Sequence, residues 1–247
     1  TVTTALGYTL AATVDVKISG NISADNAATI AAAAGTGTLT ATIFPGTAQN
    51  LEAALNGVTG AALTLTLTDE TVVAGDLDAL TAVTTVAINA NSVKTITADA
   101  ADVTDVSAVY AAAALKQISG LGNEAVEITG GAVAADANKV LKLTTGVVTA
   151  TVNAAAADVL LAALTDAKAT DALTLTVNGA TAAASDLKAL DAKTSVVVNA
   201  SAVGAINGSA ADIKTVLAAK TITTAAAVNA TVDGVISAAD ANTISKA

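Results

Sequence analysis

An internal repeat of about 110 residues constrains what this chain can fold into. Residues 63–106 align without a gap to residues 173–216, so that Asp76 matches Asp186 at an offset of 110 positions. Both stretches contain Asp-Leu-x-Ala-Leu and, after the next strand-like segment, Asn-Ala. A long period that contains shorter units is typical of stacked repeat arrays, in which each unit contacts only its neighbours.

The repeat extends over nearly the whole chain. Thr-Ala-Thr-Ile at 40–43 recurs as Thr-Ala-Thr-Val at 149–152, and residues 22–30 resemble residues 236–244. The sequence therefore predicts one repeat array over residues 1–247, with a long repeat at about 19–129, a second at about 130–233 and the start of a third at 234–247.

Each long repeat alternates β-rich segments with Ala-rich helical windows. The β-rich segments are centred near residues 14, 40, 65, 87, 127, 149, 175, 197 and 229, and most are about 22 to 26 residues apart. Extra short strands are expected at 93–97 and 203–207, with helices at 100–115 and 154–167. Parallel strands joined through helices take right-handed crossovers. The predicted fold is a right-handed α/β solenoid of strand–helix coils with a parallel sheet.

One face of this sheet is expected to be exposed. In Leu-Thr-Leu-Thr-Leu-Thr at 63–68, leucines would face the helices and threonines would face outward. A strand that is buried on both faces would be apolar throughout. The predicted exposed threonine face comprises Thr40, Thr42, Thr64, Thr66, Thr149, Thr151, Thr174 and Thr176. Flat threonine arrays also occur in ice-binding β-solenoids, although β-propensity alone explains threonine on a solvated strand.

Several helical windows open with residues that start helices. Ser209 and Ser237 each precede an aspartate by three positions, and Asp99 precedes Asp102 in a weaker form of the same pattern. Asp76 and Asp186 recur at one repeat position, which predicts a capping role. Because a unique active site is not normally copied once per repeat, the prediction is that the chain is not an enzyme and has no cofactor.

The residue inventory limits catalysis and metal binding further. The chain has no histidine, cysteine or methionine, so thiolate chemistry and thiolate zinc sites are excluded. Oxygen ligands for a structural calcium ion remain possible, although no EF-hand or glycine-rich calcium repeat is present. The candidate calcium ligands are Asp69, Glu70, Asp76, Asp78, Asp99, Asp102 and Asp105.

Charge and composition point to the setting. The net charge is -10, and all eleven basic residues are lysines, so neither nucleic acid nor an anionic membrane is an expected partner. No uninterrupted apolar run of 18 residues indicates membrane insertion. A chain without sulfur fits a protein that is produced in bulk and exported, which predicts an extracellular or cell-surface location.

Three phrases carry a family resemblance. They are GDLDALTAVTTVAINANSV at 75–93, SDLKALDAKTSVVVNASAV at 185–203 and SGLGNEAVEITGGAVAADANKV at 119–140. The chain resembles repeats in very large secreted or cell-surface proteins of marine picocyanobacteria. The resemblance implies an extracellular structural or adhesive role, and it brings no catalytic residues.

Three functions compete at this point. The first is a structural protein of a surface layer, fibre or filament, with end-to-end self-association that covers the uncapped ends of the array. The second is an adhesin-type module that presents the threonine face to a glycan, a cell surface or ice. The third, a hydrolase on a parallel β-solenoid, requires a cluster of aspartates on the exposed face.

Overall fold

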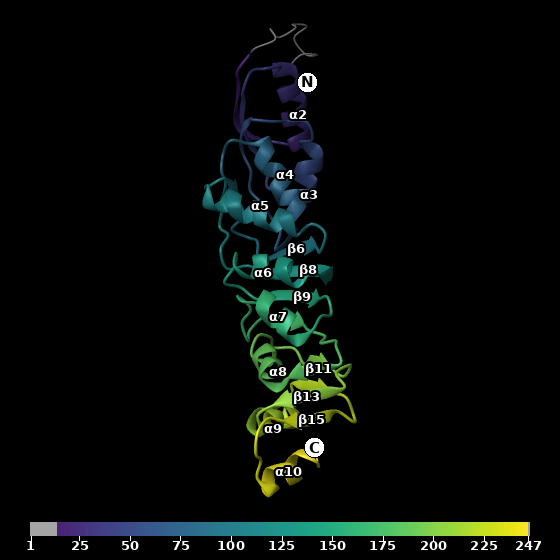
Figure 1. Ribbon diagram of the computed structural model, residues 1–247. Coiled ribbons are helices and arrows are strands. Elements are labelled where there is room, and N and C mark those ends of the chain that lie inside the picture. The colour runs from purple at the N-terminus through teal and green to yellow at the C-terminus, as the bar shows by residue number, and fades with distance from the viewer. Residues whose placement is uncertain (1–13, 247) are drawn as a thin grey trace. The chain divides into compact units, whose positions relative to one another are not determined.

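The computed structural model (Figure 1) describes residues 14–246. By their internal contacts these residues form two compact units. Unit 1 comprises the described residues up to Ala98 together with Thr104–Ala125, and unit 2 comprises Asp99–Val103 and the described residues from Val126 onward. Both units mix helices with parallel strands. The prediction of an α/β chain with parallel sheets is therefore confirmed. The first β-rich segment, near residue 14, lies partly outside the described residues.

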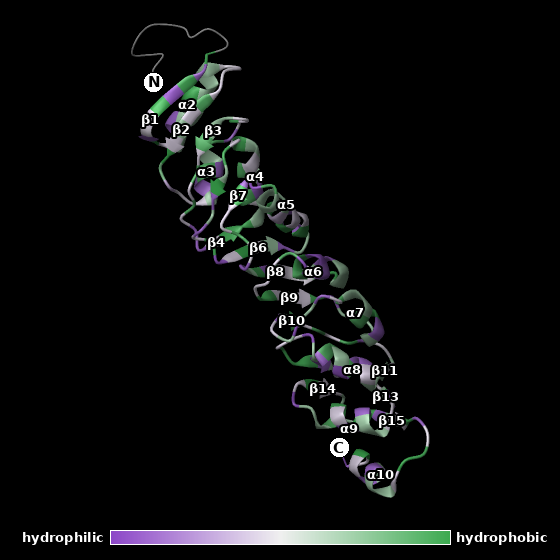
Figure 2. Cartoon of the chain, turned by 90° about the vertical axis from the view of Figure 1, so that its left-hand side faces the viewer, coloured by the Kyte–Doolittle hydropathy of each residue, from purple (hydrophilic) through white to green (hydrophobic). Residues whose placement is uncertain are grey.

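Unit 1 pairs its strands in parallel. Its elements are β1 (Val16–Ile22), α2 (Ala24–Ala34), β2 (Leu39–Ile43), α3 (Ala48–Ala54), β3 (Ala62–Thr64), β4 (Thr71–Val73), α4 (Ala74–Val83), β5 (Ile88–Asn89), β6 (Thr95–Asp99), α5 (Val103–Ala114) and β7 (Ile118–Ser119). Strands β1, β2 and β3 form one sheet, β4 pairs with β6, and β5 pairs with β7. Helix α2 lies against β1 and β2 (Figure 2).

Unit 2 repeats this arrangement. Its elements are β8 (Ala125–Ala132), α6 (Ala134–Leu141), β9 (Val148–Val152), α7 (Ala157–Ala163), β10 (Ala172–Thr174), β11 (Thr181–Ala183), α8 (Ala184–Asp191), β12 (Val198–Ala200), β13 (Ala205–Gly208), α9 (Ala210–Ala218), β14 (Ile222–Thr224), β15 (Asn229–Val232) and α10 (Ala238–Ile244). Strands β8, β9 and β10 pair in parallel, as do β11, β13 and β15, and β12 pairs with β14. Helices α6 to α9 lie on one side of the unit 2 strands (Figure 1).

The core is built from aliphatic side chains in alternation with exposed positions. Strands β2 and β9 each bury their first, third and fifth residues and expose the second and fourth. The leucines of 63–68 are buried, with Leu63 and Leu65 fully covered. This confirms that leucines face inward while Thr64 and Thr68 stay exposed.

Two predicted helices differ from the observed ones. The helix expected at 100–115 begins only at Val103, because a turn occupies the preceding residues. In that turn the Asp99 carboxylate accepts the Ala101 amide at 3.0 Å and the Asp99 carbonyl accepts the Asp102 amide at 2.9 Å. Asp99 therefore closes a local turn and is not the predicted N-cap. Helix α7 is also shorter than 154–167, since Ala155 pairs with Val177 as an isolated bridge.

The predicted serine caps are confirmed. The Ser209 and Ser237 hydroxyl oxygens accept the backbone amides of Asp212 and Asp240, each at 3.1 Å. The predicted capping role of Asp76 and Asp186 is wrong. Each is the third residue of its helix, and the N-cap residues Val73 and Ala183 make no side-chain cap bond. Both carboxylates still lie in the first turn, where the positive end of the helix dipole favours them.

Candidate functional surface

The threonine face of unit 1 pairs threonine with threonine at one level. Thr42 lies opposite Thr64 across β2 and β3, and both are exposed. Thr40, also exposed, lies opposite Ala62, and the half-buried Thr66 lies opposite Asn89. On their other side Thr40 and Thr42 lie opposite Lys17 and Asn21 of β1, so the pair of hydroxyls is bordered by alanine, asparagine and lysine.

Unit 2 reproduces this pattern. The exposed Thr151 and Thr174 lie opposite each other across β9 and β10. Thr149, also exposed, lies between Ala172 and the exposed Glu127, and the half-buried Thr176 pairs with Asn199. The threonine hydroxyl groups can donate and accept hydrogen bonds and the methyl groups can make apolar contacts, but neither group carries a charge for acid–base chemistry.

The acidic residues of unit 1 serve local contacts. The Asp69 carboxylate accepts the Ala48 amide at 2.9 Å, at the start of α3. Glu70 forms an ion pair with Lys94 at 2.6 Å, and the hydrogen bond from Lys94 lowers the pKa of the Glu70 carboxyl. Asp76 lies in the first turn of α4. Each of these carboxylates therefore acts at a different place in the unit.

Asp78 and Asp105 form a pair of like charges in unit 1. Partial burial of Asp78, and secondarily the nearby Asp105 carboxylate, raise the pKa of the Asp78 carboxyl. Lys188 occupies the position of Asp78 in the second repeat, at an offset of 110. There Lys188 forms an ion pair with Asp212, and the hydrogen bond from the Lys188 ammonium group lowers the pKa of the Asp212 carboxyl. The equivalent position therefore carries a negatively charged side chain in the first repeat and a positively charged one in the second.

The remaining calcium candidates, Asp99 and Asp102, belong to unit 2. Asp99 is engaged in the turn before α5, and Asp102 precedes the first residue of that helix. Across residues 14–246, no group of three or more acidic side chains is placed to hold a metal ion. In the same part of the chain, every helix is too short or too polar to cross a membrane.

Buried threonines join neighbouring strands in both units. The Thr84 hydroxyl accepts the Leu63 amide at 3.0 Å and donates to the Leu63 carbonyl at 2.6 Å, while it also accepts the Val86 amide. Thr194, 110 positions later, makes the same bonds to Leu173 at 3.0 and 2.7 Å. Each hydroxyl thus bonds to the amide and carbonyl of a leucine 21 residues earlier, where the backbone of a neighbouring strand would otherwise bond.

Two buried carboxylates also hold backbone amide groups in place. Asp171 is 1% exposed, and its two carboxylate oxygens accept the Val148 amide at 3.0 Å and the Lys168 amide at 2.8 Å. In unit 1, Glu124 is 3% exposed and accepts the Tyr110 hydroxyl at 3.2 Å and the Gly122 amide. Buried carboxylates with such donors are satisfied, so they organise the backbone.

Four residues form what we call the Asn138 clasp: Asn138, Lys142, Thr165 and Asp166. The Asn138 side-chain nitrogen donates to the Asp166 carboxylate at 2.8 Å, and the Asn138 side-chain oxygen accepts the Asp166 amide at 2.8 Å. Lys142 lies 3.5 Å from the same carboxylate. Hydrogen bonds from Thr165 and Asn138 lower the pKa of the Asp166 carboxyl. The clasp joins α6 to the turn that follows α7.

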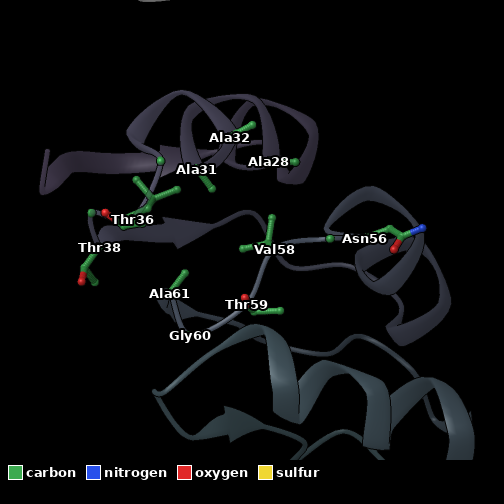
Figure 3. A pocket seen from close by; sticks show the side chains of 14 residues that line it. Ala28, Ala31, Ala32, Thr36, Thr38, Asn56, Val58, Thr59, Gly60 and Ala61 are labelled. Atoms are coloured by element: carbon green, nitrogen blue, oxygen red, sulfur yellow. The ribbon is translucent and has the colours of Figure 1, made fainter. Parts of the chain in front are cut away.

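Unit 1 has a cavity where unit 2 has the clasp. Relative to its N-cap, α2 carries Ala28, Ala31 and Ala32 where α6 carries Asn138, Leu141 and Lys142. Asn56 and Gly57 follow α3 where Thr165 and Asp166 follow α7. These five residues line a cavity of about 660 Å³, with the α2 alanines above and Asn56 below (Figure 3). The remaining lining is glycine, threonine and aliphatic residues, so no titratable group enters it.

Sequence reasoning missed the buried polar groups, although one signal could have found some of them. Thr84 and Thr194 recur at an offset of 110, within three residues of the ends of the Asp-Leu-x-Ala-Leu helices. Thr144 follows α6 in the same way and accepts the Gly146 amide at 2.9 Å. No family model, curated protein or solved structure matches this chain.

Proposed function

We propose that this chain is a structural repeat protein of an extracellular layer, fibre or filament. In this proposal it is a right-handed solenoid of strand–helix coils, with the extracellular role that its resemblance to repeats in large surface proteins of marine picocyanobacteria implies. It has neither a catalytic role nor a cofactor. The array is extended by stacking one coil on the next, and molecules also associate end to end.

One observation carries the proposal: many polar side chains of the described residues connect one coil to the next. Thr84 and Thr194 bond to backbone groups 21 residues earlier, and Lys188 reaches Asp212 24 residues later. Lys214 reaches Asp240 in the same way. Repeat proteins gain much of their stability at such nearest-neighbour interfaces.

Deletion of one coil tests the architecture. Ala150 and Leu173 are opposite each other in the β9–β10 register, so removal of residues 150–172 joins equivalent positions. A repeat array should keep its fold and far-ultraviolet circular dichroism per residue, with a lower unfolding midpoint. A matched deletion out of phase, residues 150–160, should unfold unit 2. If both deletions unfold the chain equally, the array proposal fails.

Self-association is tested on the whole chain. Sedimentation over a range of concentrations, with negative-stain microscopy, should reveal growth along one direction. A single monomeric species at all concentrations would remove end-to-end self-association from the proposal, while the coil-deletion test would still decide on the array.

The alternative function is an adhesin-type module. The exposed pairs Thr42–Thr64 and Thr151–Thr174 favour it, because they place the same small polar group on both units. A glycan array with the wild type and with Thr42→Val and Thr64→Val together would detect a sugar ligand. A thermal-hysteresis measurement on the same two proteins would detect ice binding.

A further inference from the structure

We propose that the uncovered side of the coil formed by β15 and α10 is a docking site for a strand–helix coil of the β9–α7 type. The inference rests on the proposed function, since it treats coils as interchangeable members of an array. It names the chemistry of the partner, which is an alternating Val-Thr-Ala-Thr-Val strand, a helix and a Thr-Asp turn.

Three coils of the chain are built alike. Gly20, Gly130 and Gly234 have φ angles of 87°, 79° and 81°, a left-handed region that favours glycine. Three residues after each glycine comes the N-cap of a helix, and the three helices are α2, α6 and α10. The β15–α10 coil therefore corresponds to β1–α2 and to β8–α6.

The other two coils show what covers this side. Strand β2 pairs with β1 through bonds from the Val16 amide to the Thr38 carbonyl at 2.9 Å and from the Phe44 amide to the Ile22 carbonyl at 3.0 Å. Strand β9 pairs with β8 through the matching bonds, Val126 to Val147 at 3.0 Å and Asn153 to Ala132 at 2.8 Å. In β15–α10 the equivalent groups are the Ala230 amide and the Ile236 carbonyl.

Burial differs between this coil and its β8–α6 counterpart. In β8–α6, Val126, Ala132, Ala137 and Val140 are buried. Their counterparts Ala230, Ile236, Ala241 and Ile244 are exposed or half-buried, and α10 has no buried residue. The four counterparts line a groove of about 490 Å³. Its apolar floor matches the inward residues of an alternating strand.

The first half of the Asn138 clasp is also present in α10. Asn242 and Lys246 occupy the positions of Asn138 and Lys142, which hold Asp166 after α7. At these positions α2 has only Ala28 and Ala32, which face the cavity of unit 1. The amide and the ammonium group of α10 therefore select a coil whose helix is followed by threonine and aspartate, as α7 is.

The test uses the full chain and a synthetic peptide with the sequence of residues 143–166. Titration calorimetry should detect binding, and hydrogen exchange at the Ala230 amide should slow when the peptide is present. Ile236→Asp in the chain, or Asp166→Ala in the peptide, should each weaken binding at least about tenfold. Val235→Asp is the matched control, because the Val235 side chain is 105% exposed and its counterpart is Gly131.

Three results would overturn the inference: no binding of the peptide, binding that Ile236→Asp leaves unchanged, or dimerisation of the chain through Ile236 without peptide binding. The last result would make a second copy of this chain the occupant. Circular dichroism of each variant checks that the fold is kept. If the peptide fails while deletion of residues 150–172 still yields a folded chain, this inference falls and the proposed array stands.

Discussion

The Thr84 hydroxyl both accepts from and donates to the backbone of Leu63, at 3.0 and 2.6 Å. The two residues lie 21 positions apart, so one side chain joins two successive turns of the chain. Thr194 and Leu173 repeat this relationship in unit 2. Loss of such a hydroxyl removes hydrogen bonds inside the core, where water is not available to replace them.

Thr84→Val is therefore expected to destabilise unit 1 by about 1–3 kcal/mol, because the Leu63 and Val86 amides lose their acceptor. Urea unfolding followed by circular dichroism measures the change. Thr84→Ser keeps the hydroxyl and should recover most of the loss. Thr64→Val, at an exposed strand position, should change stability by less than about 0.5 kcal/mol. Equal stability of the Thr84 and Thr64 variants would contradict the role assigned to the hydroxyl.

The like charges of Asp78 and Asp105 predict a second result. Asp78→Lys places in unit 1 the charge that Lys188 supplies in unit 2, and should raise the unfolding midpoint at low salt. Lys188→Asp should lower it, because Asp212 loses its cation. Both effects should shrink as salt is added, since these side chains are partly exposed. Shifts of the same sign in the two variants would refute the assignment.

The raised pKa of Asp78 has a consequence for pH dependence. The folded state holds the Asp78 proton more tightly than the unfolded state, so this group's contribution to stability falls as the pH rises from about 3.9 through the raised value. Asp78→Asn should therefore stabilise the chain at neutral pH, and the gain over wild type should vanish below about pH 3.9. Unfolding midpoints across this range measure it, and a gain that is independent of pH would contradict it.

The Asn138 clasp predicts the opposite pH response. Hydrogen bonds lower the pKa of Asp166, so its stabilising contribution is complete above the usual value of about 3.9 and is lost as the pH falls through the lowered value. Asn138→Ala should lower stability at neutral pH and weaken this acid dependence. The two proteins should converge in acid, apart from the packing lost with the side chain. If the curves of stability against pH for the two proteins run parallel, Asn138 acts without Asp166.

The cavity of unit 1 offers a gain of stability. Ala31 lines it, and its counterpart Leu141 is buried in unit 2. Ala31→Leu should stabilise unit 1 by about 1 kcal/mol through added apolar burial. Leu141→Ala should cost about 2–5 kcal/mol. Ala111→Leu, at an exposed position of α5, serves as the control and should be nearly neutral. If Ala31→Leu and Ala111→Leu behave alike, the cavity does not accept the side chain.

Much of the fold could be predicted because its signals are local and repeated. Alternation of leucine and threonine at 63–68 predicted which side chains are buried, since successive residues of a strand point to opposite faces. Ser209 and Ser237 predicted helix starts, because a cap bonds to the backbone three residues away. The predicted start of α5 was wrong because Asp99 closes a turn. The spacing of Asp99 and Asp102 in the sequence does not distinguish such a turn from a helix cap.

Contacts between coils could not be predicted in the same way. The sequence by itself determined the period, the alternation of strand and helix and the residue types that are available for chemistry. Only the tertiary structure decided that Asn138 meets Asp166 while Ala28 and Gly57 leave a cavity. It also decided that Asp78 lies near Asp105. The physical reason is that these partners are more than 20 residues apart, so strand register and helix start fix their distance.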